Sequence, residues 1–186
     1  MAQNLMFKNI FECVLNNEID IVSWLIKSGI DVNKKTDNDW TMLHYAACDS
    51  LTDMAKMLLE CGANANLFDK LHRIPLFLAA YHGHLEIVEL LIDYGSSINV
   101  KDVYGCTPLF CSCCHRNMGE HSVTNIYPDK FYSDTNRLKI IKLLIKHGAD
   151  VNIKNDNGYT ALHWISYQRH AEMVKLLINH GAKFNG

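Results

Sequence analysis

The sequence has no excess of either charge and no long hydrophobic run. Its 18 lysines and arginines stand against 20 aspartates and glutamates, which gives a formal net charge of −2. This balance argues against nucleic acid or an anionic membrane as a partner, because both attract proteins mainly through basic residues. No apolar stretch approaches the roughly 20 residues that a helix needs to span a bilayer. The N-terminal residues show no basic segment followed by an unbroken apolar one, so we expect neither a secretory signal nor a membrane partner.

The sequence also lacks the even set of cysteines that is typical of a disulfide framework. It has seven cysteines, at positions 13, 48, 61, 106, 111, 113 and 114. Disulfide frameworks usually have an even number and belong to smaller secreted domains. We therefore expect free thiols and a reducing, cytoplasmic location. With 48% hydrophobic and 20% charged residues, the composition is that of an ordinary folded protein.

What the sequence does contain is an internal repeat. Five segments end in a glycine that is followed four residues later by an asparagine, and successive glycines lie 33, 33, 53 and 33 residues apart. A second phrase recurs with the same spacings and reads TMLHYAA, IPLFLAA, TPLFCSC and TALHWIS. In HLEIVELLIDYG, which precedes one of these glycines, the apolar residues fall at helical spacing on one face. Each period therefore predicts two helices, a glycine cap and a turn into the next period.

The 33-residue period, the TPLH-like phrase and the leucine pair before the glycine resemble the ankyrin repeat. This resemblance covers nearly the whole chain and implies an all-α solenoid of helix-turn-helix units joined by β-turn fingers, forming a single domain over 1–186. The first unit lacks the TPLH-like phrase, so we interpret it as an N-terminal capping repeat. The last unit either caps itself, with Lys175, Asn179 and His180 facing solvent, or leaves an apolar edge exposed. The expected units are about 5–35, 36–68, 69–101, 102–154 and 155–186.

Two of the expected fingers lack the glycine that the other two have. Gly105 and Gly158 occupy this position in the fourth and fifth units, whereas Asp39 and His72 occupy it in the second and third. The position favours a left-handed backbone, which Asp and His tolerate better than most residues. The histidines of the TPLH-like phrase, His44 among them, are expected to bond the finger backbone.

The single 53-residue spacing places 20 additional residues between the two helices of the fourth unit, within 115–136. Long insertions add little free energy to a repeat array, so this one is either a neutral surface loop or a binding loop. As a binding loop it would present three aromatic side chains to a partner, since aromatic residues dominate interface energetics. These residues are Tyr127, Phe131 and Tyr132.

Cysteines and histidines gather in the stretch 106–123, CTPLFCSCCHRNMGEHSV. Cys111 and Cys114, three apart on a predicted helix, together with His115 and His121, are candidate ligands of a zinc- or redox-responsive site. A structural zinc site usually draws two ligands from a second element, and the sequence offers no second pair. A catalytic thiol would need an oriented base and an oxyanion site, which the repeat pattern does not provide. We therefore expect no metal, no cofactor and no enzymatic activity, and interpret Cys113 as a small core residue.

The resemblance implies a protein-interaction module that binds its partner through the finger tips and the concave face of the first helices. An aromatic and arginine row on successive fingers is the expected hot spot. The residues at these positions are Trp40, Tyr45, Lys70, Arg73, Tyr81, Tyr104, Tyr159 and Tyr167. We expect a monomer. The short array, rich in Asn, Ile and Lys, is similar to ankyrin proteins of intracellular bacteria and large DNA viruses, which favours a host-directed role.

Overall fold

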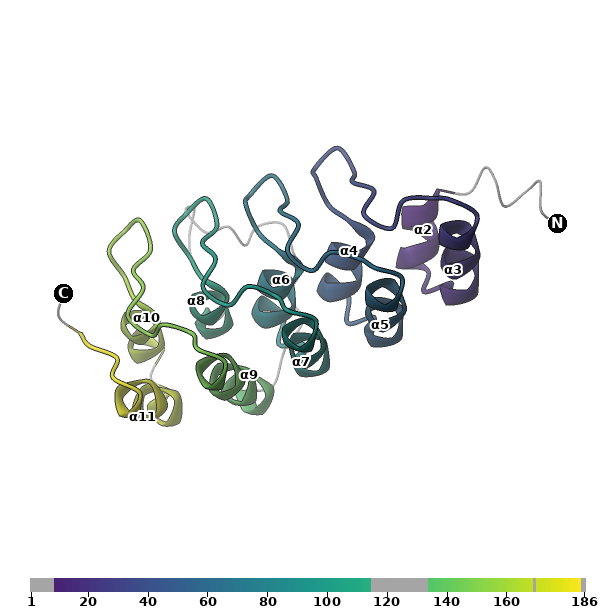
Figure 1. The fold of residues 1–186 in the computed structure, drawn as a ribbon. Coiled ribbons are helices and arrows are strands. Elements are labelled where there is room, and N and C mark those ends of the chain that lie inside the picture. Colours follow the sequence, from purple (N-terminus) through teal and green to yellow (C-terminus); the bar gives the residue numbers. More distant parts are fainter. Residues whose placement is uncertain (1–8, 115–133, 169, 185–186) are drawn as a thin grey trace. The chain divides into compact units, whose positions relative to one another are not determined.

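The computed structural model describes residues 9–114, 134–168 and 170–184. Over these ranges the chain forms short helices joined by tight turns (Figure 1). The β-structure in the same ranges is an isolated bridge between Lys35 and Thr41. The prediction of an all-α fold is therefore confirmed. The insertion residues Tyr127, Phe131 and Tyr132 lie outside the described residues.

The described helices follow the predicted alternation of a first and a second helix in each unit. Within a unit, α2 contacts α3, α4 contacts α5, α8 contacts α9 and α10 contacts α11. The helices are α2 (Ile10–Leu15), α3 (Ile19–Lys27), α4 (Met42–Cys48), α5 (Thr52–Glu60), α6 (Pro75–Tyr81), α7 (Leu85–Asp93), α8 (Pro108–Cys113), α9 (Asp134–Lys146), α10 (Ala161–Tyr167) and α11 (Ala171–Asn179).

The first helices begin where the sequence predicts. The backbone N–H of Thr41 donates to Nδ1 of His44 at 3.1 Å, and Thr41 Oγ1 accepts from the backbone N–H of His44 at 3.4 Å. This reciprocal pair is a capping box that satisfies two backbone donors of the first turn. Pro75 and Pro108 are the first residues of α6 and α8, where proline loses no helical hydrogen bond.

The second helices end at the repeated glycines. In α5, the N–H of Gly62 donates to the carbonyl of Leu59, and the N–H of Ala63 donates to the carbonyl of Leu58 at 2.9 Å. This closure needs a left-handed residue, and Gly62 has φ +89°. The asparagine four residues later joins one repeat to the next: Asn66 Nδ2 donates to the carbonyl of Gly95 at 2.9 Å, and its Oδ1 accepts from the N–H of Ser97 at 2.8 Å.

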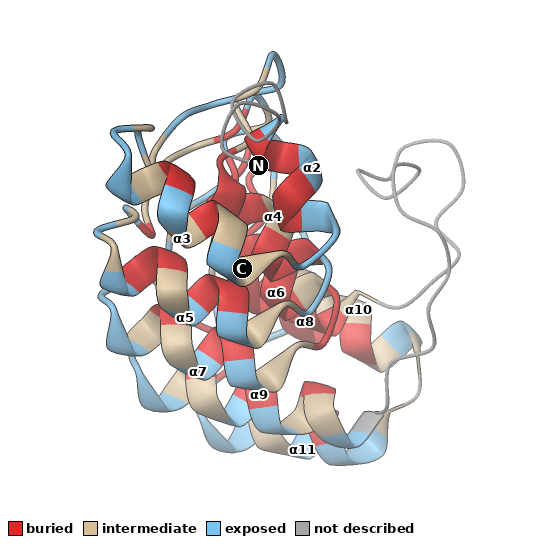
Figure 2. Ribbon diagram, turned by 90° about the vertical axis from the view of Figure 1, so that its right-hand side faces the viewer, coloured by how far each residue is buried: buried red, intermediate tan, exposed pale blue. Residues whose placement is uncertain are grey.

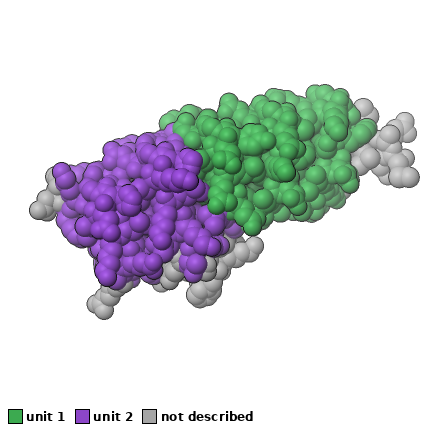
Figure 3. All heavy atoms as spheres, turned by 60° about the horizontal axis from the view of Figure 1, so that its bottom comes forward, with its two compact units in different colours: residues 1–79, 86–97 green, residues 80–85, 98–186 purple. Residues whose placement is uncertain are grey.

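The chain divides into two compact units (Figure 3), with the boundary passing through α6. Unit 1 comprises 1–79 and 86–97, and unit 2 comprises 80–85 and 98–186. In unit 1, α2 packs on α4 and α3 on α5; in unit 2, α8 packs on α10 and α9 on α11. The boundaries of the five repeats, and their description as one domain, remain predictions.

Each unit has its own core along the inner sides of its helices (Figure 2). The second leucine of the pair that precedes the capping glycine is fully buried in every repeat in which it occurs. These residues are Leu58 and Leu91 in unit 1 and Leu144 and Leu177 in unit 2. Equivalent residues therefore have equivalent surroundings, as stacking of similar repeats requires.

Candidate protein-binding surface

The fingers that connect the repeats share one backbone conformation. In the third finger (68–74), the N–H of Asp69 donates to the carbonyl of Arg73 at 2.9 Å. The Asp69 carboxylate also accepts from the backbone N–H groups of Leu71 and Arg73 through Oδ1, at 2.9 and 2.8 Å. Asp102 in the fourth finger (101–107) and Asn155 in the fifth (154–160) make the same two backbone contacts. A side chain that caps its own turn in this way fixes the loop without help from neighbours.

The position that the sequence predicts to be left-handed is left-handed in all four fingers. Asp39 and His72 have φ values of 60° and 59°, and Gly105 and Gly158 have 73° and 81°. The prediction that Asp and His adopt this backbone is confirmed. One left-handed residue is what allows the chain to reverse within each finger.

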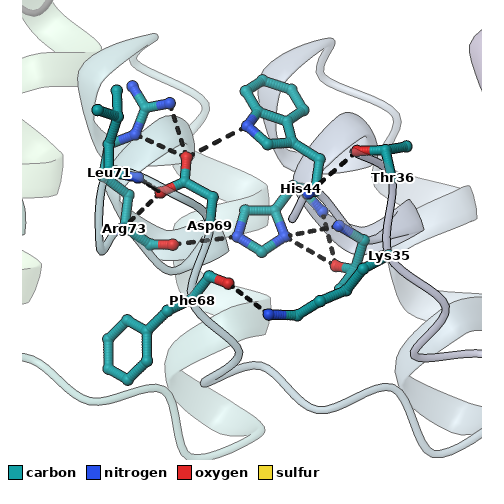
Figure 4. A network of polar contacts seen from close by, with 9 residues as sticks. Lys35, Thr36, His44, Phe68, Asp69, Leu71 and Arg73 are labelled. Atoms are coloured by element: carbon teal, nitrogen blue, oxygen red, sulfur yellow. Dashed lines mark hydrogen bonds and ion pairs between the residues drawn. The ribbon is translucent and has the colours of Figure 1, made fainter. Parts of the chain in front are cut away.

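The fingers of unit 1 are joined by a buried ion pair (Figure 4). Arg73 donates to Asp69 Oδ2 through Nε at 2.9 Å and through Nη2 at 2.7 Å. Trp40, from the second finger (35–41), donates to the same oxygen through Nε1 at 3.2 Å. The expectation that Arg73 is exposed for a partner is wrong, because the residue is only 6% exposed and its guanidinium is held by Asp69.

His44 lies beside this ion pair and extends the link between the second and third fingers. Because its Nδ1 accepts from the N–H of Thr41, Nε2 carries the proton and donates to the carbonyl of Arg73 at 3.1 Å. Burial lowers the pKa of His44 from 6.5 to about 4, so the ring is neutral near pH 7. The predicted bond from this histidine to the finger backbone is confirmed.

The other predicted residues of unit 1 are only partly available to a partner. Trp40 and Tyr45 are half-buried and meet edge to face, with ring centroids 4.9 Å apart. Tyr45 also contacts Phe11, at 5.7 Å. Lys70 is exposed at the tip of the third finger, where its backbone N–H donates to the carbonyl of Asn38 at 3.2 Å. The aromatic rings of these fingers therefore serve mainly to pack unit 1.

In unit 2 the predicted tyrosines are exposed. Tyr104 is 42% exposed at the tip of the fourth finger and Tyr159 is 50% exposed at the base of the fifth, while Tyr167 is 84% exposed at the end of α10. The carbonyl of Tyr104 accepts from the N–H of Asp156 at 3.0 Å, which joins the fourth and fifth fingers. Tyr81 is half-buried, with its ring 5.0 Å from that of His82.

Comparison with protein families agrees with this geometry. A family model described as ankyrin repeats (3 copies) matches residues 10–102, 68–123 and 132–186. The chain belongs to the ankyrin-repeat family. Helix pairs, glycine caps and hydrogen-bonded fingers are thus the ankyrin repeat itself, and ankyrin repeats are generally protein-protein interaction modules.

Individual relatives are similar to this ankyrin array over most of its length. An ankyrin repeat protein of fowlpox virus (strain NVSL) is 28% identical over 167 residues, which are 89% of this chain and 19% of the viral protein. Human inversin is 28% identical over 162 residues, 87% of this chain and 14% of inversin. Mouse protein phosphatase 1 regulatory subunit 27 is 36% identical over 53 residues, 28% of this chain and 34% of the subunit. The chain therefore spans about a third or less of the length of these relatives.

One exposed residue of the ankyrin fingers was not predicted from the sequence. Val103 lies next to Tyr104 and is also exposed. A signal for it exists, because the same finger position holds charged residues elsewhere, namely Asp37, Lys70 and Asp156. An aliphatic side chain at a loop tip that is otherwise charged marks a place where apolar surface is left in water.

The cysteines near the end of α8 are arranged differently from the prediction. α8 ends at Cys113, and Cys114 has an extended backbone, with φ −75° and ψ 121°. The expectation that Cys111 and Cys114 share a helix face is therefore wrong, because Cys114 has left the helix. Its Sγ donates to the carbonyl of Phe110 at 3.4 Å. Cys113 is fully buried at an ankyrin core position, as predicted.

These thiols are poorly suited to bind a metal or attack a substrate. Burial raises the pKa of Cys106 and of Cys113 to about 12, and burial raises the pKa of Cys114 well above its usual range. Since the thiolate is the reactive and metal-binding form, these groups are protonated and inert at neutral pH. Among the described residues, no group of three or more His, Cys, Asp and Glu side chains is placed to hold a metal ion. His115 and His121 lie outside the described residues.

None of the helices in the described ranges combines the length and the apolar character that a membrane crossing requires.

Proposed function

We propose that this ankyrin array binds a partner protein through the exposed tyrosines of unit 2 and has no enzymatic activity of its own. The proposed anchors are Tyr104, Tyr159 and Tyr167, with Val103 beside the first. Exposed tyrosines on a scaffold are typical hot-spot residues, because a tyrosine buries a large apolar ring and still offers a hydroxyl for hydrogen bonding. The observation that carries the proposal is the exposure of these tyrosines in unit 2, where the rings of unit 1 are largely used internally.

The rigidity of the fingers supports the same surface. The backbone around Tyr104 is fixed by the Asp102 carboxylate, which accepts from the N–H groups of Tyr104 and Cys106 at 2.9 and 2.8 Å. Asn155 does the same for Tyr159. A ring presented from an ordered loop loses little conformational entropy on binding, so more of its contact energy appears as affinity.

The remaining predicted residues take secondary places in this proposal. Lys70 is exposed and offers a charge at the rim, while Trp40, Tyr45 and Tyr81 are half-buried and present only part of their rings. Arg73 has no direct contact with the partner in this proposal, because its guanidinium supports the fingers from inside. The aromatic residues Tyr127, Phe131 and Tyr132 of the insertion form the alternative binding surface.

The partner that we propose is a protein in a reducing compartment such as the cytoplasm. All seven cysteines are free thiols, as expected where disulfides do not persist. The near-balance of charge leaves aromatic contacts rather than electrostatic attraction as the main source of affinity. The similarity to a fowlpox virus ankyrin repeat protein supports a host protein as the partner, in line with the composition of the chain.

The experiment is an affinity pull-down in which Tyr104→Ala and Tyr159→Ala are combined in one variant. We expect partner recovery at limiting bait to fall at least about tenfold, since a hot-spot residue contributes more than about 1 kcal/mol. Tyr94→Ala is the matched control, because Tyr94 is a similarly exposed tyrosine just beyond α7 and outside the fingers.

The proposal fails if the Tyr104 and Tyr159 variant recovers the partner as well as the wild type does. A second variant, in which residues 116–132 are replaced by a short Gly/Ser linker, tests the insertion. Loss of binding in this variant alone would assign the site to Tyr127, Phe131 and Tyr132.

A further inference from the structure

The last repeat leaves open a surface that earlier repeats cover. We define the end face of unit 2 by five residues of α10, α11 and the segment after α11: His163, Ser166, Val174, Ile178 and Phe184. None of them is buried, and Ile178 and Phe184 are 47% and 48% exposed. In the second repeat the same five positions are all buried, and they hold His44, Ala47, Ala55, Leu59 and Ala65.

The fourth repeat, within the same unit, shows what normally covers these positions. Its counterparts of the end-face residues are Phe110, Cys113, Ile141, Ile145 and Val151, of which all but Ile145 are buried. They belong to the side of α8 and α9 on which α10 and α11 pack. The ring of Phe110, for example, lies 6.3 Å from that of Trp164. The end face is therefore the stacking surface of an ankyrin repeat with no further repeat packed against it.

The chemistry of the end face is that of an interior rather than of a cap. Terminal repeats of an array normally present a polar outer side. Lys175, Asn179 and His180 of α11 are exposed, as expected for a cap, but Ile178 and Phe184 are exposed with them. The sequence left two possibilities for this repeat, and the exposed apolar residues favour the uncovered edge.

A polar group on the end face points to the same conclusion. In unit 1, Nε2 of His44 donates to the carbonyl of Arg73, which belongs to the following repeat. His163 has the same capping contact, since its Nδ1 accepts from the N–H of Thr160 at 3.2 Å. Among the described residues, however, no carbonyl lies opposite its Nε2, and its ring instead meets that of Phe184 edge-on at 5.9 Å.

We propose that the end face is a dimer interface, through which two copies of this chain pack face to face about a two-fold axis. The face continues the stacking surface of unit 2, and it contains no Asp, Glu, Lys or Arg. Two copies can therefore meet there without bringing like charges together, and closed two-fold dimers are the commonest symmetric assembly. This proposal replaces the expectation of a monomer, and it does not depend on partner binding by the tyrosines.

A head-to-tail arrangement fits the residues less well. The side of the first repeat that would meet the end face of another copy includes exposed Asn9, Glu12 and Asn16 on and beside α2. Glu12 occupies the position that Trp164 occupies in the fifth repeat. Stacking this side on Ile178 and Phe184 would bury a carboxylate against apolar groups, which is strongly unfavourable.

The test is sedimentation velocity of the full chain over about 1 to 100 µM, a range in which a specific dimer shows mass action. We expect the wild type to sediment as a dimer at the upper end and to dissociate on dilution. Ile178→Lys should weaken the dimer at least tenfold, because it places two lysines at the centre of the interface. Leu15→Lys is the matched control, since Leu15 is an equally exposed apolar residue of unit 1.

Three outcomes would overturn the proposal. The first is a wild type that stays monomeric over the whole range, which would leave the end face to a further repeat or to another protein. The second is growth beyond the dimer, which indicates head-to-tail stacking. The third is a dimer that Ile178→Lys leaves unchanged. Far-UV circular dichroism of both variants shows that they are folded, and unchanged partner recovery by Ile178→Lys separates this interface from the tyrosine site.

Discussion

The fingers of unit 1 and of unit 2 have the same backbone and use their side chains differently. In unit 1 the residue that ends the turn, Trp40 or Arg73, binds the Asp69 carboxylate and locks neighbouring fingers together. In unit 2 the corresponding residues are Cys106, which is buried, and Tyr159, whose ring is half exposed to water. The comparison teaches that hydrogen bonds within each finger are enough to fix its shape. The variable side chain is then available either for stability or for binding.

The largest effect is expected where the lock of unit 1 is broken. Asp69→Ala leaves the buried guanidinium of Arg73 without its partner and should lower the free energy of unfolding by about 3–5 kcal/mol. Urea denaturation followed by tryptophan fluorescence measures this change. Asn155→Ala, the counterpart in unit 2, removes contacts to backbone N–H groups but no ion pair, and should cost only about 1 kcal/mol.

The double variant Asp69→Ala with Arg73→Leu sharpens the same comparison. Because it removes the buried charge together with its partner, it should recover part of the stability that Asp69→Ala loses. Equal losses for Asp69→Ala and Asn155→Ala would contradict the role assigned to the ion pair.

The next effect concerns pH and the neutral His44 of unit 1. The folded pKa of His44, about 4, lies below its usual value of 6.5, so the folded state binds fewer protons than the unfolded state between these values. The stability that this provides is fully present above pH 6.5 and is lost as pH falls toward 4, by about 3 kcal/mol in total. Unfolding free energies between pH 7 and 4 measure the slope. His44→Phe, which copies the residue at the same position in the fourth repeat, should flatten it; an unchanged slope would rule His44 out as the cause.

A smaller effect distinguishes the two glycine fingers of unit 2. A Cβ on Gly105 would lie 2.8 Å from the backbone nitrogen of Asp156, whereas a Cβ on Gly158 would meet no atom within 4 Å. Gly105→Ala should therefore cost about 2 kcal/mol or more, from the left-handed backbone together with the clash. Gly158→Ala should cost about 1 kcal/mol from the backbone alone. Thermal unfolding of both variants tests this, and a larger loss at Gly158 would show that the fourth and fifth fingers are not closely joined.

Features set by nearby residues were predictable from the sequence. The helix ends at the repeated glycines, the left-handed Asp39 and His72, and the bond from His44 to the finger backbone all follow from short motifs in phase. The burial of Arg73 did not, because it depends on Asp69 and on Trp40 from another finger. The exit of Cys114 from α8 was missed for a similar reason, since the insertion that follows interrupts the periodic pattern. The exposure of Ile178 and Phe184 could not be read either, because the same residue types are buried inside the array.

The smallest expected effect on stability belongs to the residues with the largest proposed role in binding. Tyr104→Ala should change the free energy of unfolding by less than about 0.5 kcal/mol, since it removes an exposed ring that supports no neighbour. Chemical denaturation measures this change. A loss of 2 kcal/mol would mean that Tyr104 serves to pack the fourth finger, as Trp40 does in unit 1.

Site-specific photo-crosslinking is the most direct test of the central claim that the tyrosines of unit 2 contact the partner. A photo-reactive phenylalanine analogue is placed at position 104, 159 or 94, and the adducts are identified by mass spectrometry. We predict one shared adduct from positions 104 and 159 and none from position 94. Excess wild-type protein should suppress this adduct, whereas an excess of the variant carrying Tyr104→Ala and Tyr159→Ala should not. Crosslinking that is equal at all three positions, or that both competitors suppress alike, would contradict the account.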